Sequence, residues 1–114
     1  MVVIVIARNA PNQQAKASMI VRFNIDMTGP EQYEYRVTYE GEDLYADAGL
    51  GSLEDCVTAA LEGLGNAAVA AEVAFKGVIS GTYALASLAL ASSQIAQHAM
   101  QTTEAIEEAL QNAG

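Results

Sequence analysis

The sequence of 114 residues has no tryptophan, only two phenylalanines, and a single cysteine, Cys56. One cysteine allows neither an internal disulfide nor a multi-cysteine zinc site. Because large aromatic residues are so few, we expect alanine, valine, leucine, isoleucine and tyrosine to fill the core. The apolar fraction of 52% excludes a disordered chain and is enough for a core of this size.

Basic side chains are also scarce. Five Lys and Arg residues stand against 14 Asp and Glu residues, which gives a formal net charge of −9. This balance argues against sequence-independent binding to nucleic acid, which needs Lys and Arg to displace counterions. It also argues against attachment to an anionic membrane. A basic protein is the kind of foreign partner that the charge favours.

Long apolar runs are missing as well. The run Val2–Ala7 is short, is followed by Arg8 and has no basic region before it, so it predicts a buried strand rather than a signal peptide. The segment Gly77–Thr103 holds 27 residues without a charge. Its three glutamines and one histidine make it a weak candidate for a membrane span. We therefore expect no membrane partner and a location in the cytoplasm or in a virion.

Two stretches of alternating residues predict an antiparallel hairpin over residues 18–40. Every second residue from Met19 to Met27 is apolar, and every second residue from Tyr33 to Tyr39 is tyrosine or valine. A turn over residues 28–31 separates them. A period of two places the apolar side chains on one face of a sheet. We therefore interpret the tyrosines as core residues rather than as a platform for a ligand.

The next segment predicts a connector and then a helix. Residues 40–51 contain glycine and acidic residues, and within them Leu44 and Tyr45 form at most a short strand. Ser52 can cap a helix, and Glu54 and Asp55 suit its positive end. Glycines and an asparagine within residues 63–66 end this helix. The apolar residues on one face are Leu53, Val57, Ala60, Leu61 and Leu64.

Residues 67–83 are compatible with either strand or helix. Val73–Gly77 echoes Val37–Gly41 at an offset of 36 residues, and a helix follows each block after a short gap. This echo favours a strand. If residues 67–83 are helical instead, the C-terminal half becomes a helical hairpin.

The last segment predicts one long helix from Ala84 to Asn112, because no Gly or Pro interrupts a run rich in Ala and Leu. Small residues in the middle of its apolar stripe allow close packing on a sheet or on another helix. The stripe consists of Leu85, Leu88, Ser92, Ile95, Ala99, Ile106 and Leu110.

These elements predict a single α+β domain over residues 1–114. We expect a small antiparallel sheet in the order β-β-β-(β)-α-β-(β)-α. Two helices, of which the C-terminal one is long, pack on one face of it.

Carboxylates are concentrated between residues 31 and 55, where a single arginine offsets them. Asp43, Asp47 and Glu54 have the spacing of three ligands in a calcium loop, but Tyr45 and Ala48 occupy positions that need a ligand and a glycine. We therefore predict no metal site and interpret the segment as an acidic rim that binds a basic partner. The acidic rim consists of Glu31, Glu34, Glu40, Glu42, Asp43, Asp47, Glu54 and Asp55.

The sequence contains no strong enzyme motif. A catalytic pair of Cys56 and His98 is conceivable, but the carboxylates beside Cys56 raise a thiol pKa and favour a packed structural cysteine. Gly49–Ser52 precedes a helix but lacks the lysine of a phosphate-binding loop. We therefore predict that the protein is not an enzyme and uses no cofactor.

Two functions fit these observations. The first is a non-enzymatic binding protein whose acidic rim engages a basic nucleic-acid-processing protein by charge mimicry. Small inhibitors that mobile elements and phages carry, including anti-restriction and anti-CRISPR proteins, form such a class. The second is a structural homo-oligomer, such as a virion or assembly subunit, joined through the Ala/Ser-rich C-terminal helix. Its predicted self-association surface is formed by Leu90, Gln94, Gln97 and Met100.

Overall fold

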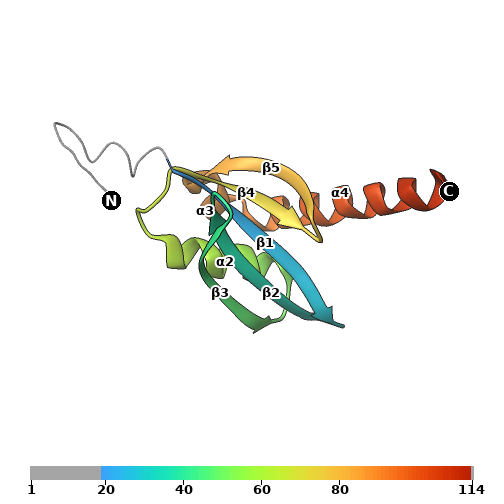
Figure 1. Ribbon diagram of the computed structural model, residues 1–114, viewed down its shortest axis with the longest axis horizontal. Coiled ribbons are helices and arrows are strands. Elements are labelled where there is room, and N and C mark those ends of the chain that lie inside the picture. Colours follow the sequence, from blue (N-terminus) through green and yellow to red (C-terminus); the bar gives the residue numbers. More distant parts are fainter. Residues whose placement is uncertain (1–18, 114) are drawn as a thin grey trace.

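The computed structural model describes residues 19–113, so the expected strand at Val2–Ala7 lies outside the described residues. Residues 19–113 form a five-stranded mixed sheet and three helices, which confirms the α+β class (Figure 1). The strands lie in the order β3-β2-β1-β4-β5. Their bounds are β1 Ile20–Gly29, β2 Gln32–Tyr39, β3 Glu42–Leu50, β4 Ala70–Phe75 and β5 Val78–Ala84. The helices are α2 Leu53–Leu64, α3 Leu85–Leu90 and α4 Ser92–Ala113.

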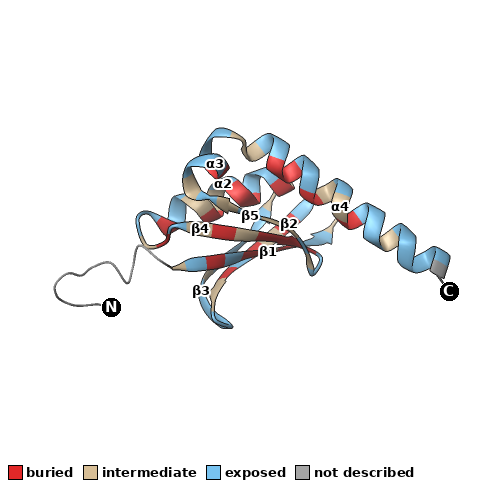
Figure 2. Cartoon of the chain, turned by 90° about the horizontal axis from the view of Figure 1, so that it is seen from above, coloured by how far each residue is buried: buried red, intermediate tan, exposed pale blue. Residues whose placement is uncertain are grey.

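The predicted hairpin is formed by β1 and β2, which pair antiparallel. Phe23 and Ile25 of β1 are buried beside Tyr35 and Val37 of β2, while the alternate positions Arg22 and Arg36 face solvent. The tyrosines thus belong to the core, as the period of two predicts. The helices lie on one side of the sheet (Figure 2), and most of the alternate residues of β1, on its other side, are exposed.

Strand β3 is longer than the sequence indicates: it has nine residues, seven of which pair with β2, where we expected a connector. The strand lies at an edge of the described sheet and most of its side chains are exposed. Few of its residues therefore needed to be apolar, and the pattern of a strand is weak. Its main contact with the core is Tyr45, whose hydroxyl donates to the carbonyl of Ala60 in α2.

Residues 70–84 form two strands, so the strand interpretation of residues 67–83 is confirmed. Strand β5 pairs antiparallel with β4, but β4 pairs parallel with β1, which we did not expect in an antiparallel sheet. The parallel pair follows from the path of the chain. Strand β3 ends at the far end of the sheet, and α2 carries the chain back to the end where Ile20 lies beside Ala70. A strand that starts there must run in the same direction as β1.

Helix α2 begins as the sequence predicts. The side chain of Ser52 accepts a hydrogen bond of 3.0 Å from the backbone N–H of Asp55, which satisfies a free donor of the first turn. The helix ends at Gly65, whose φ of 57° lies in the left-handed region that glycine adopts without strain. Leu53, Val57 and Ala60 are buried against the sheet.

The predicted long C-terminal helix is confirmed as α4, but its start at Ala84 is wrong, because the chain forms two helices that are separated at Ala91. This residue has φ −127° and ψ 32°, outside helical geometry. The break lets α3 pack against α2 and β5 while α4 runs along β4 and β5. No Gly or Pro marks it in the sequence, although serines, which favour helix starts, follow at 92 and 93. Tertiary packing therefore decides where the helix breaks.

Helix α4 is longer than the strands that support it. Its 22 residues span about 33 Å, whereas the six residues of β4 span about 20 Å. Its C-terminal end therefore projects beyond the sheet (Figures 1 and 2). Ile106 and Leu110, at the C-terminal end of the predicted apolar stripe, are 44% and 69% exposed, whereas Ile95 and Ala99 of the same stripe are buried. Within residues 19–113, no helix is both long and apolar enough to cross a membrane.

Candidate protein-binding surfaces

The acidic rim is not one compact patch. Glu31 lies in the turn between β1 and β2, and Glu40 lies in the turn between β2 and β3. These turns are at opposite ends of β2, whose eight residues span about 27 Å. A partner that contacts both residues must therefore follow the whole length of the strand.

The rim is also divided between the two faces of the sheet. Residues paired across antiparallel strands share a face. Asp47 is paired with Tyr35 and Glu42 with Tyr39, so both acidic residues lie on the side that the helices cover. Glu34 alternates with Tyr35 and lies on the open side. The open and covered sides thus each carry part of the predicted rim.

The start of α2 carries two carboxylates of the acidic rim, Glu54 and Asp55. Burial, followed by the charges of Asp55, Asp47 and Glu34, raises the pKa of the Cys56 thiol to about 12. Asp47 of β3 lies on the side of the sheet that the helices cover, and Glu54 and Asp55 lie in the first turn of α2 on that side. The exposed carboxylates Asp47, Glu54 and Asp55 form a surface that we call the α2 acidic cluster.

Every cation of the described residues lies beside a carboxylate. Arg22 is 2.9 Å from Glu72, Arg36 is 3.1 Å from Asp43, and Lys76 is 3.7 Å from Glu107. Three of the 14 carboxylates are neutralised in this way, and the other eleven form no ion pair within residues 19–113. All of these except half-buried Glu34 are exposed. The surface described here therefore offers negative charge that is available to a partner.

Cys56 and His98 do not form an accessible pair. Cys56 is fully buried, and its raised pKa keeps the thiol protonated at neutral pH. His98 is exposed on α4, and its Nε2 lies 3.5 Å from the hydroxyl of Thr102. These positions agree with a packed structural cysteine. Among residues 19–113 there is also no group of three or more His, Cys, Asp or Glu side chains that could hold a metal ion.

The break at Ala91 changes the predicted self-association surface. Leu90 is the last residue of α3 and is 88% exposed, whereas Gln94 and Gln97 are exposed on α4. Met100 is half-buried and packs against the core. The four residues therefore lie on two helices rather than on one, and Leu90 is the strongest apolar feature among them.

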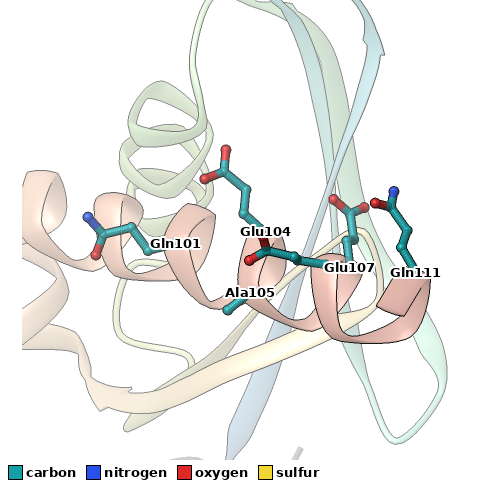
Figure 3. Close-up of a pocket in the computed structure, with 6 residues that line it drawn as sticks. Gln101, Glu104, Ala105, Glu107 and Gln111 are labelled. Atoms are coloured by element: carbon teal, nitrogen blue, oxygen red, sulfur yellow. The ribbon is translucent and has the colours of Figure 1, made fainter. Parts of the chain in front are cut away.

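The projecting end of α4 forms a further surface, which sequence reasoning missed. A shallow depression of about 590 Å³ runs along it, and all of the residues that line it come from this one helix (Figure 3). Because it is open to solvent, it is a helix surface rather than an enclosed cavity. The feature that could have revealed this surface is the length of the helix, since a helix of about 33 Å cannot be covered along its whole length by strands of about 20 Å. The lining residues are Gln101, Glu104, Ala105, Glu107, Glu108 and Gln111.

No protein-family model, curated protein or solved structure matches this chain.

Proposed function

We propose that this protein is a non-enzymatic interaction protein that binds a basic surface of another protein through its carboxylates. The observation that carries the proposal is which of its charged side chains form ion pairs. Each described cation is within 3.7 Å of a carboxylate, and eleven further carboxylates make no ion pair within residues 19–113. Such a surface attracts a basic partner over several ångströms and repels acidic ones.

A nucleic-acid-processing protein is the class of partner that we propose, because its basic groove is already built to hold a dense array of negative charges. The protein would occupy this groove and exclude nucleic acid from it. Support comes from the charge and from the spread of carboxylates along β2, β3 and the start of α2. A groove that follows the length of β2 could contact both Glu31 and Glu40.

The test uses a panel of purified basic nucleic-acid-binding proteins that includes a restriction endonuclease and a Cas9-type nuclease, with an acidic protein of similar size as the control. We expect binding at about 50 mM salt that weakens steeply by about 200 mM, because exposed charges are screened. Duplex DNA should compete with it. Binding that does not change with salt, or no binding to any basic protein in the panel, would contradict the proposal.

The α2 acidic cluster provides a matched pair of variants. Asp47→Asn combined with Asp55→Asn removes two charges of this cluster and keeps the shape of both side chains. Glu62→Gln combined with Asp26→Asn removes two exposed charges outside the acidic rim. We expect the first pair to weaken binding to a basic partner more than the second pair does. Equal effects would indicate attraction by net charge alone.

A second candidate function is self-assembly through the uncharged surface around Leu90. The observation that favours it is the 88% exposure of this leucine within a segment that has no charges to repel a second copy. Under this proposal the protein is a subunit of a homo-oligomer, and Gln94 and Gln97 add polar contacts. Its test is the oligomeric state in solution.

A further inference from the structure

The hairpins β2–β3 and β4–β5 turn in the same way at positions 36 residues apart. Glu40 and Gly41 connect β2 to β3, and Lys76 and Gly77 connect β4 to β5. The φ angles are 51° and 85° in the first turn and 53° and 81° in the second. A two-residue turn with both residues at positive φ matches the twist of a hairpin. The second turn therefore repeats the geometry of the first, residue by residue.

The pairing of the strands repeats at the same offset. Near each turn the register shifts once, because the second strand contains one extra residue, Leu44 in β3 and Ser80 in β5. Ser80 follows Leu44 by 36 residues, so the shift falls at the same place in both hairpins. The three pairs next to the turn correspond one to one. They are Val37 with Tyr45, Thr38 with Asp43 and Tyr39 with Glu42 in the first hairpin, and Val73 with Gly81, Ala74 with Ile79 and Phe75 with Val78 in the second.

Both hairpins are placed about one residue of β1. Phe23 pairs with Val37 of β2 on one side and with Val73 of β4 on the other, and these valines are 36 residues apart. Strand β2 runs antiparallel to β1 and β4 runs parallel to it, so the two hairpins point in opposite directions (Figure 1). A two-fold axis that passes through Phe23, perpendicular to the sheet, produces this relation. The strand order β3-β2-β1-β4-β5 has the same symmetry.

A helix follows each hairpin and packs on the strands of that hairpin. Helix α2 packs on β2 and β3, whereas α4 packs on β4 and β5, and both helices lie on the same side of the sheet (Figure 2). Their buried residues correspond at an offset of 39, with α3 inserted before the second helix. The buried residues are Cys56, Val57, Ala60 and Leu64 in α2, and Ile95, Ala96, Ala99 and Thr103 in α4.

We infer that residues 32–64 and 70–103 are two copies of one ββα unit, related by a pseudo-two-fold axis through Phe23. Three features agree, and each depends on a different interaction. The turn depends on the local backbone, the register on hydrogen bonds between strands, and the buried helix positions on packing against the sheet. A repeated supersecondary unit accounts for all three. The inference concerns the fold and does not depend on the proposed function.

The two copies differ in charge near the turn. The carboxylates of the first copy have basic or apolar counterparts in the second, so the ββα unit does not require a carboxylate at these positions. Exchanging the two segments therefore leaves the net charge of −9 unchanged and replaces residues that the unit does not need. The corresponding residues are Glu40, Glu42 and Asp43 in the first copy, and Lys76, Val78 and Ile79 in the second.

The test is an in-phase exchange in the full chain, in which residues 40–44 and 76–80 change places. Each hairpin then receives the turn and the extra residue of the other. The exchange removes only the exposed ion pairs of Arg36 and Lys76, which contribute little to stability. We expect cooperative unfolding with a urea midpoint within about 1 M of the wild type and an unchanged slope. Cross-strand NOEs between residues 37 and 45, and between 73 and 81, should remain.

The matched control is an exchange that is out of phase by one residue. Residues 41–45 are placed at positions 76–80, and residues 77–81 are placed at positions 40–44, so the net charge is again unchanged. Position 77 then holds glutamate and position 41 holds valine, where the native φ angles are 81° and 85°. Valine is strained at such an angle, and the turn glycine is displaced in both hairpins. We expect this variant to lose both sets of NOEs and cooperative unfolding.

Two results would overturn the inference. Each half of the in-phase exchange is also made alone. Loss of the cross-strand NOEs in the full exchange and in both single grafts would show that the hairpins are not equivalent. An out-of-phase variant that folds as well as the in-phase variant would show that the offset of 36 residues has no structural meaning. Neither result involves a binding partner, so the proposed function is tested separately.

Discussion

At the scale of single residues, Thr103 joins the long helix to the sheet through a buried polar contact. It is 1% exposed, and its hydroxyl donates to the carbonyl of Phe75 at the end of β4. A buried carbonyl that loses its donor is left without water to replace it. The contact therefore ties α4 to the end of β4.

We expect Thr103→Val to lower the free energy of unfolding by about 1–2 kcal/mol, because the shape is kept and the donor is lost. The control is Thr102→Val, since the hydroxyl of the half-buried Thr102 contacts only the exposed His98 in the described residues. This control should change stability by less than about 0.5 kcal/mol. Urea unfolding measures both variants, and equal losses would show that the bond to Phe75 contributes little.

Cys56 makes stability depend on pH in the alkaline range. Burial and the nearby charges of Asp55, Asp47 and Glu34 raise its pKa from 9.0 to about 12 in the folded protein. Because the thiolate is disfavoured only in the folded state, this contribution to stability is complete below pH 9 and is lost as the pH rises toward 12. The pKa of Tyr45 is raised from 10.0 to about 12, chiefly by burial, so its effect begins about one pH unit higher.

Between about pH 8 and pH 10, we expect the free energy of unfolding to fall by about 1 kcal/mol more in the wild type than in Cys56→Ala. The comparison uses urea titrations of both proteins at the two pH values. The thiol of the folded wild type should also resist labelling at pH 8 until the protein unfolds. Identical pH dependence in the two proteins would show that Cys56 does not titrate as we infer.

At the scale of elements, α2 and β3 are joined through an aromatic ring that packs on a glycine. A Cβ atom at Gly63 would lie 2.7 Å from Cε2 of Tyr45. The ring has little freedom to move, because its hydroxyl donates to the carbonyl of Ala60 and it forms a T-shaped contact with the ring of Tyr35, with centroids 6.2 Å apart. Because Gly63 has no side chain, the ring of Tyr45 in β3 can pack closely against α2. Gly63 also lies near the end of this helix.

We expect Gly63→Ala to destabilise the wild type, although alanine favours a helix over glycine by about 1 kcal/mol. In a Tyr45→Ala background the obstacle is gone, and the same change should stabilise the protein by up to about 1 kcal/mol. Thermal or urea unfolding of the four proteins in this double-mutant cycle measures the reversal of sign. A stabilising effect in both backgrounds would mean that the ring moves aside freely.

At the scale of the whole molecule, charge and apolar exposure are distributed unevenly. The uncharged segment between residues 77 and 103 includes Leu90, whereas the carboxylates lie along β2, β3, the start of α2 and the end of α4. A contact between copies is therefore favoured around Leu90, and a contact with a basic protein is favoured elsewhere. The two candidate functions use different surfaces and can be tested independently.

For self-assembly, we expect light scattering to give a mass larger than that of one 11.9 kDa chain, and Leu90→Glu to reduce this mass to that of a monomer. The variant should unfold at the same urea concentration, within about 0.5 kcal/mol, because Leu90 is 88% exposed in the single chain. Leu110→Ala serves as the control and should leave the mass unchanged. A monomeric wild type would contradict this candidate function.

Local patterns predicted those parts of the fold in which neighbouring residues share one environment. The alternation from Met19 to Tyr39 predicts the hairpin because one face of both strands is buried. Ser52 predicts the start of α2 because its cap lies within three residues. The length of β3 was missed because an edge strand needs few apolar residues, and the break at Ala91 was missed because contacts between helices decide it.

The amino-acid sequence by itself determined the net charge, the absence of an internal disulfide, the buried faces of the hairpin and the boundaries of α2. These properties depend on composition or on residues only a few positions apart. Only the tertiary structure decided which carboxylates are paired, that β4 runs parallel to β1, and that Ile106 and Leu110 are exposed. Each of these properties depends on how elements that are distant in the sequence are placed next to one another. Because β4 is shorter than α4, the apolar residues at the C-terminal end of this helix are exposed.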